Sequence, residues 1–165
     1  MEVHLSDAPT TRDWRPLQVM VAPGSVLVVS TGAGPFEQAL LDGRHVLTAD
    51  EPAEVGGGDA GPGPYELLLM ALGACTSMTV KSYAARKSWP LDGVEVRLSH
   101  GKVYDQDCVN CENENAMIDR IERSLRLLGP LSAEQRGRLL EIANKCPVHR
   151  TLTSRINIRT VLDPA

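Results

Sequence analysis

The groups that could do chemistry in this chain are its thiols. There are four, Cys75, Cys108, Cys111 and Cys146, and a histidine, His149, follows the last of them by three residues. The sequence has no glycine-rich phosphate-binding pattern, no GxSxG nucleophile turn and no HExxH metal motif. We therefore look to the cysteines as nucleophiles, redox partners or metal ligands.

Cys146 directly precedes Pro147, and proline favours the first position of a helix. Cys146 is then the residue that caps that helix, where free main-chain N–H groups lower the pKa of a thiol. His149 and Arg150 fall in the next turn and can add positive charge. The pattern favours a reactive thiol, and the alternative is a small buried hydrophobic residue at a junction between elements.

The surroundings of Cys75, taken alone, predict an inert thiol. It ends the longest nearly apolar run, Leu67 to Cys75, inside a helix expected from Pro64 to about Lys87. Burial among apolar side chains raises the pKa of a thiol. The run is far shorter than the roughly 20 residues of a membrane-spanning helix. We therefore predict a helix buried on every side in a folded core and no membrane partner.

Cys108 and Cys111 have the spacing of half a zinc site. Together with Cys146 and His149 they would make a Cys₃His set in two pairs. The 34 residues between Cys111 and Cys146 form a longer gap than that of a compact zinc finger. An exposed, reducible pair of thiols in an acidic loop is the alternative, and the spacing leaves both open.

The elements that position these residues follow from the hydrophobic pattern. In the first third, β-branched and apolar runs separated by Pro23-Gly24 and Asp42-Gly43 predict an antiparallel β-meander, with strands at 18–20, 25–29, 36–41 and 44–47. A glycine-rich loop over 54–63 leads into the long helix.

The second half of the chain begins, after that helix, with two alternating runs. The run over 94–98 predicts one strand, and Ile121, Arg123, Leu125 and Leu127 fall on one face of another. Ser132 and Gln135 form a capping box that starts a further helix. A short turn follows Pro147, and alternation over 156–160 predicts a last strand.

Length and composition describe an ordinary folded domain. The chain has 165 residues, 42% of them hydrophobic and 23% charged, which excludes wholesale disorder. We predict a single domain over 17–162 after a flexible segment over 1–16. A net charge of −4 argues against nucleic acid as the main partner. Since the N-terminus shows no secretory signal, we expect a cytoplasmic protein with reduced cysteines.

Two separated cysteine motifs resemble those of the OsmC/Ohr family. They are GPGPYELLLMALGACT over 61–76 and CPVHRTL over 146–152, with ADEP upstream over 49–52 and DCVNCE between them over 107–112. The resemblance covers about residues 17–162. It implies an α+β fold in which antiparallel β-sheet elements wrap around long central helices in an intertwined homodimer.

The same resemblance implies thiol-dependent reduction of organic hydroperoxides. It makes Cys75 the peroxidatic thiol, which reverses the expectation from its apolar surroundings, and Cys146 the resolving thiol. In the family, an arginine from an early hairpin supports the peroxidatic cysteine and is held by a glutamate early in the central helix. Here Glu66 lies one position from the place of the family glutamate, Arg44 is the candidate arginine, and His149 is a third supporting candidate.

The implied reaction needs a dithiol reductant and no metal or organic cofactor. The expected partners are a second copy of the chain, an organic hydroperoxide and the dithiol. Two alternatives remain open: a zinc-stabilised protein that uses Cys108, Cys111, Cys146 and His149, and a family-shaped small-molecule binder without peroxidase turnover.

Overall fold

A computed structural model describes residues 13–104 and 117–163. The chain divides into two compact units, Met1–Leu67 and Leu68–Ala165. In the described residues, helices are combined with antiparallel sheets, so the predicted α+β class is confirmed. The prediction of one domain over 17–162 stays a prediction.

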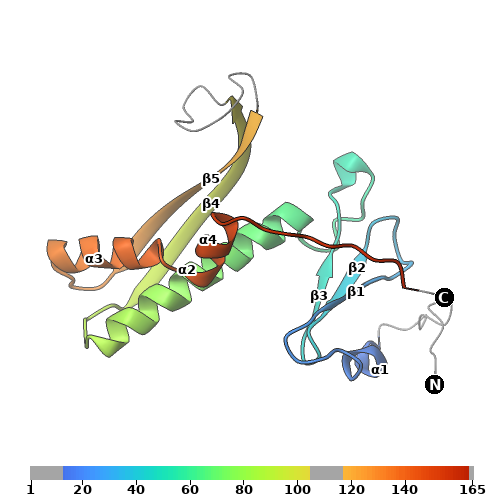
Figure 1. Cartoon of the computed structure of the whole chain (residues 1–165), viewed down its shortest axis with the longest axis horizontal. Coiled ribbons are helices and arrows are strands. Elements are labelled where there is room, and N and C mark those ends of the chain that lie inside the picture. Colours follow the sequence, from blue (N-terminus) through green and yellow to red (C-terminus); the bar gives the residue numbers. More distant parts are fainter. Residues whose placement is uncertain (1–12, 105–116, 164–165) are drawn as a thin grey trace. The chain divides into compact units, whose positions relative to one another are not determined.

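The first unit is built on a three-stranded antiparallel sheet (Figure 1). After the short helix α1 (Arg15–Gln18), the strands β1 (Leu27–Ser30), β2 (Gln38–Leu41) and β3 (Val46–Ala49) pair in chain order. The meander is therefore confirmed. The strand predicted at 18–20 is wrong, because Pro16 in the first turn of α1 fixes a helical φ and the chain turns there instead.

A small apolar cluster holds this sheet to the segment before it. Val29, Ala39 and Leu41 are buried, and Trp14 and Leu17 from the region of α1 pack against them. The burial alternates along β2, as expected when one face of a sheet is covered.

The loop that follows β3 is organised by Asp50, whose side chain is almost fully buried. Its carboxylate accepts main-chain N–H groups of Glu51 at 2.9 Å, Gly58 at 2.9 Å and Ala60 at 3.2 Å. Burial raises the pKa of this carboxyl, but the three hydrogen bonds outweigh burial and hold the pKa below its ordinary value. A Cβ at Gly57 would overlap the Glu51 carbonyl, so the loop requires glycine there.

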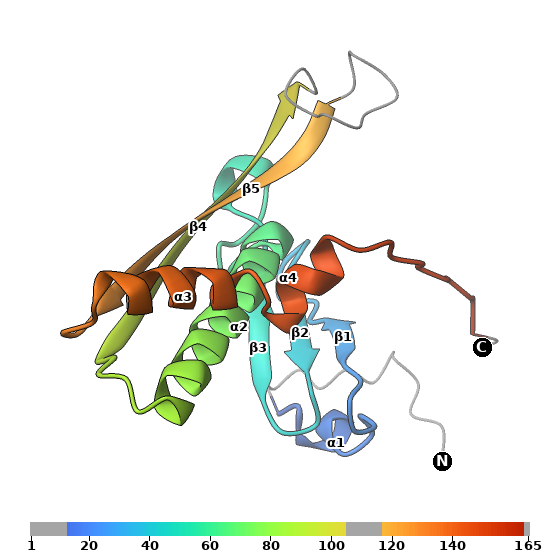
Figure 2. The same cartoon turned by 60° about the vertical axis from the view of Figure 1, so that its left-hand side comes forward.

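The second unit is arranged around the long helix α2 (Pro64–Arg86), most of which belongs to it. The predicted helix is confirmed to within one residue. The strands β4 (Gly93–Tyr104) and β5 (Met117–Leu128) form a long antiparallel hairpin beside α2, followed by α3 (Ala133–Ala143) and α4 (Pro147–Leu152) (Figures 1 and 2). The capping box of Ser132 and Gln135 is present at the start of α3, as predicted.

The core of the second unit joins α2, α3 and the hairpin. Its buried members are Val80, Ala84, Leu131, Leu139 and Ala143, with side chains of β4 and β5 packed against them. Closer to the middle of α2, a Cβ on Gly73 would lie 2.9 Å from Leu98 of β4. The absence of a side chain at Gly73 lets the helix and the strand approach closely.

Residues 155–163 belong to no strand in the described part of the chain, so the last predicted strand is wrong for the single chain. The alternating residues Ile156 and Ile158 are exposed there. Alternation gives this segment one apolar face, but a strand forms only where a neighbouring strand supplies the hydrogen-bond partners.

Among the described residues, one helix, α2, is long and apolar enough to cross a membrane by length and composition. The nine-residue apolar run does not predict a span of this length. The helix continues beyond the run to Arg86, and its added polar residues leave its mean hydropathy high enough for a span. The core helix of a soluble protein meets the same criteria. Val80 and Ala84 of α2 belong to the buried core, but only 22% of its apolar window is buried in the single chain, so the predicted burial on every side is not met there.

Candidate active site

Cys146 caps helix α4, as the sequence predicted. Its main chain is extended at φ −64° and ψ 144°, Pro147 opens the helix, and the main-chain N–H of His149 donates to Sγ at 3.4 Å. The residue is fully buried. The local sequence therefore both starts the helix and aims a hydrogen-bond donor at the sulfur.

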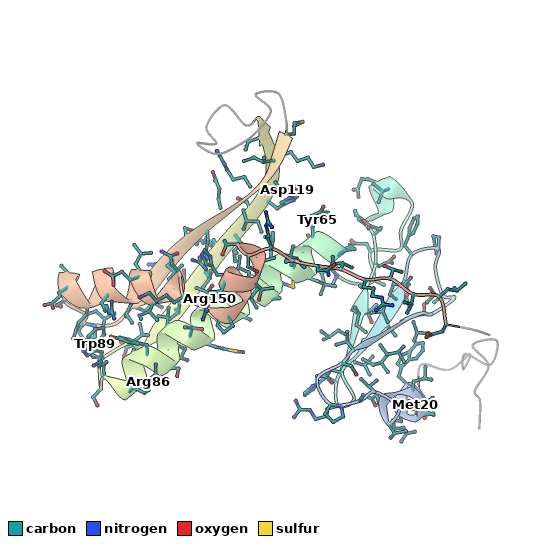
Figure 3. The ribbon with its side chains drawn as sticks, viewed as in Figure 1. Met20, Tyr65, Arg86, Trp89, Asp119 and Arg150 are labelled. Atoms are coloured by element: carbon teal, nitrogen blue, oxygen red, sulfur yellow. The ribbon has the colours of Figure 1, made fainter. Side chains whose placement is uncertain are left out.

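Cys75 reaches the same place from α2. Its Sγ accepts the main-chain N–H of Val148 at 3.5 Å, and its thiol hydrogen-bonds the Cys146 sulfur. Both cysteines are free thiols, and Cys75 is the more exposed of the two. Figure 3 labels Arg150 on α4, which lies beside α2 at this point. The structure thus brings together the two cysteine motifs that the sequence keeps apart.

A polar network of three side chains adjoins the thiol pair. The Thr76 hydroxyl lies 3.6 Å from the Cys146 sulfur. Arg123 of β5 donates from Nη1 to Thr76 Oγ1 at 2.8 Å and from Nη2 to Asn144 Oδ1 at 2.7 Å. Through Thr76 of α2, the network connects β5 and the end of α3 to the Cys146 sulfur.

These contacts ease the ionisation of Cys146, as its position at the helix cap predicted. Burial raises the pKa of Cys146, but this is outweighed by hydrogen bonds from Thr76, the His149 N–H and Cys75 and by the charge of Arg123. The net pKa lies below the ordinary value for cysteine. The Cys75 thiol therefore donates to a sulfur whose ionised form is stabilised by its contacts.

The three supporting candidates contribute differently. His149 provides its main-chain N–H to Cys146. The Glu66 carboxylate accepts the N–H of Gly63 at 2.9 Å and so caps the start of α2. Arg44 lies exposed in the β2–β3 turn, where its N–H donates to Asp42. The redox roles predicted for Glu66 and Arg44, which both belong to the first unit, stay predictions.

Sequence reasoning missed Thr76, Arg123 and Asn144. A signal existed for Arg123, because it occupies the apolar face of an alternating strand that also carries Leu125 and Leu127. A charged residue in such a face requires a buried or half-buried polar partner. Thr76 and Asn144 gave no comparable signal, because a threonine in a helix and an asparagine at its end are ordinary residues.

Of the four ligands in the zinc alternative, the structure describes Cys146 and His149. Cys108 and Cys111 lie outside the described residues. Within residues 13–104 and 117–163, no group of three or more histidine, cysteine, aspartate or glutamate side chains is placed to hold a metal ion.

Comparison with protein-family models gives one family. A model described as OsmC-like protein matches residues 56–161, which include both Cys75 and Cys146. No curated protein sequence matches the chain significantly.

Several solved structures share the fold. One is the OsmC-like protein from Mycoplasma pneumoniae, with a TM-score of 0.60 and 19% identity over 78% of this chain and 85% of that one. Another is an organic hydroperoxide resistance protein, OsmC, from Legionella pneumophila, with a TM-score of 0.56 and 17% identity over 80% of this chain and 91% of that one. A third is the organic hydroperoxide resistance protein OhrB of Bacillus subtilis, with a TM-score of 0.53 and 17% identity over 78% of this chain and 89% of that one. At these identities the likeness shows the fold alone.

Proposed function

Because the chain belongs to the OsmC-like family, we propose that it is a thiol-dependent peroxidase that reduces organic hydroperoxides. The observation that carries the proposal is the contact between two free thiols, Cys75 and Cys146, inside a network of hydrogen-bond donors. Two solved structures of similar fold are named organic hydroperoxide resistance proteins, which supports the same substrate class.

The difference in exposure supports Cys75 as the peroxidatic thiol. Cys75 is half-buried, whereas Cys146 is fully buried and can be reached only by a neighbour. The residues that precede Cys75 on its face of α2 by helical spacing are apolar: Leu68, Ala71 and Leu72. An apolar approach to the sulfur favours an organic hydroperoxide over hydrogen peroxide.

In the first step, the Cys75 sulfur attacks the outer oxygen of R–O–O–H and the O–O bond breaks. The Cys146 thiolate takes the Cys75 proton, which generates the nucleophile, and that proton passes to the departing alkoxide. The products are an alcohol and a sulfenic acid on Cys75, while Cys146 returns to its thiolate form. The sulfur has been oxidised and the peroxide reduced by two electrons.

In the second step, the Cys146 thiolate attacks the sulfenic sulfur of Cys75. A disulfide forms, and hydroxide leaves and takes a proton from solvent. A dithiol reductant then exchanges with this disulfide, becomes a disulfide itself and restores both thiols. The cycle uses no metal or organic cofactor, and we place it in the cytoplasm, where thiols are kept reduced.

We also propose that the working form is a homodimer. Apolar side chains of α2 remain exposed in the single chain, among them Met70 at 57% and Met78 at 70%. The C-terminal segment is similar, since Ile158 is 84% and Leu162 is 97% exposed. A second copy would cover such surfaces and could supply the strand pairing that residues 155–163 lack. Sedimentation at low micromolar concentration tests this, and a well-folded monomer would contradict it.

The central experiment follows the consumption of cumene hydroperoxide with dithiothreitol and with a lipoyl dithiol. We expect turnover in the wild type and none in Cys75→Ser, because the oxygen-accepting sulfur is gone. The matched control is Cys108→Ser with Cys111→Ser, which removes two thiols but neither member of the pair, and should retain turnover.

The outcomes separate the alternatives. Full turnover in Cys75→Ser would refute the assigned role. Stoichiometric zinc in the purified protein, lost together with folding in the Cys108→Ser, Cys111→Ser variant, would favour the metal-stabilised protein. Reactive thiols without sustained cycling would indicate a binder that has lost turnover.

A further inference from the structure

Arg123 differs from Arg126, another arginine of its strand. Arg126, three residues later in β5, is exposed and pairs with Glu95 of β4 at 3.6 Å. Arg123 instead lies on the strand face that carries the half-buried Leu125 and Leu127. A guanidinium remains charged at every pH at which a protein is folded, so this position carries a permanent positive charge.

Both terminal nitrogens of Arg123 have acceptors in the second unit. Nη2 is fixed by Asn144 Oδ1 at 2.7 Å, and Nη1 donates to Thr76 Oγ1 at 2.8 Å. Because guanidinium is a planar fork, the bond to Asn144 determines where the other nitrogen points. Arg123 is therefore oriented toward the threonine hydroxyl rather than toward solvent.

The Thr76 hydroxyl is fully buried and has one hydrogen for two acceptors. It lies 2.7 Å from the main-chain oxygen of Leu72 and 3.6 Å from the Cys146 sulfur. Arg123 can only donate, so it occupies a lone pair of the Thr76 oxygen. The hydroxyl hydrogen can then be donated either to the Leu72 oxygen or to the Cys146 sulfur.

We propose that Arg123 is a positioning residue of the thiol pair, which acts through Thr76 by orienting the threonine hydroxyl as a switchable hydrogen-bond partner of Cys146. While Cys146 is protonated, its S–H donates to Thr76 and the hydroxyl donates to Leu72. When Cys146 ionises, the hydroxyl turns and donates to the sulfur. Leu72 keeps the main-chain bond that helix α2 provides, so the turn leaves no buried acceptor unpaired.

The charged and titratable groups around Cys146 agree with this arrangement. Cys75 faces it from α2, Arg123 from β5, and α4 contributes the His149 N–H rather than a charged side chain. Among these the guanidinium is the only permanent charge, and it is one hydroxyl away from the sulfur. The inference rests on the proposed function for its purpose, namely to keep Cys146 ready to take the Cys75 proton and to attack the sulfenic acid.

The test measures ionisation and needs no peroxide, so its failure is distinct from failure of the proposed function. The reduced full-length protein is titrated with pH by its thiolate ultraviolet absorbance, and the same titration of Cys146→Ser is subtracted. The reported quantity is the first apparent pKa of the Cys75–Cys146 pair. We expect Arg123→Met to raise it by about one pH unit or more, a tenfold loss of thiolate below the midpoint. Arg123→Lys, which keeps the charge without the fork, should raise it less.

The matched control is Arg126→Met, the same substitution on the exposed pair of β5, which should leave the titration unchanged. Thr76→Val should raise the apparent pKa, and Thr76→Ser, which keeps the hydroxyl, should restore it. A folded Arg123→Met with the wild-type titration would overturn the proposal, as would equal titrations for Thr76→Val and Thr76→Ser. If Arg123→Met does not fold, the two threonine variants decide the matter by themselves.

Discussion

Asp50 in the first unit and Cys146 in the second are both buried ionisable residues. Each has a pKa below its ordinary value, but the groups that lower the pKa come from different places. Asp50 receives N–H donors from residues one, eight and ten positions along its own loop. Cys146 receives donors from α2 and α4 and the field of an arginine on β5. The first site forms when one loop folds, whereas the second exists only when three elements are assembled.

The origin of the donors determines what each site can do. A carboxylate surrounded by its own loop is fully paired and serves to fix the main chain. The thiol has a second thiol as one of its partners, so its environment includes a group with which it can exchange a proton and form a bond. A substitution can remove one side-chain donor at a time from the Cys146 site, whereas the main-chain donors to Asp50 remain whatever side chain is substituted.

The largest effect should come from removing the sulfur of the assembled site. In Cys146→Ser, we expect sustained hydroperoxide turnover to be lost while Cys75 is still oxidised once. No neighbouring thiolate then remains to close the disulfide, so a sulfenic acid accumulates. Trapping with a dione reagent and intact-mass measurement detect it. If repeated turnover continued at the wild-type rate, a different resolving thiol would have to exist.

A smaller effect, confined to stability, should follow from changing the locally built site. Asp50→Asn places an amide among three N–H donors and weakens the loop, so the melting temperature should fall at neutral pH. The stability that Asp50 supplies is fully present above the unfolded carboxyl pKa, near roughly 4, and is lost as pH falls through the lower folded value. The difference between wild type and variant should therefore shrink in acid.

The thiol titration of Asp50→Asn is the control that tests the comparison itself. It should match that of the wild type, because no donor to Cys146 comes from this loop. A shifted thiol titration with an unchanged melting temperature would mean that the two sites are coupled rather than independent.

The smallest effect should come from the outer anchor of the assembled site. Asn144→Ala removes the acceptor of Arg123 Nη2 but leaves the charge and the bond to Thr76. We expect the apparent pKa of the thiol pair to rise by less than in Arg123→Met, measured by the same thiolate titration. A shift larger than that of Arg123→Met would assign Asn144 a direct role at the sulfur.

Much of the fold was predictable because its signals are local. Pro64 and Pro147 mark the first turns of α2 and α4, and the Ser132 and Gln135 capping box marks α3. The Asp42-Gly43 turn likewise sets the β2–β3 hairpin. In each case a few neighbouring residues fix the backbone through a ring constraint, a side-chain cap or a positive φ, without help from distant parts of the chain.

The sequence by itself determined which thiols deserve chemical interest, since the cysteines and the helix cap at Cys146 are visible in it. Only the tertiary structure decided what surrounds them. Thr76 and Cys146 are 70 residues apart, and Arg123 and Thr76 are 47 apart. Periodicity shows which residues share a face of one strand or helix, but it does not show which face of another element lies opposite. That packing decides which arginine lies beside this pair, and it decides that residues 155–163 pair with no strand in the described part of the chain.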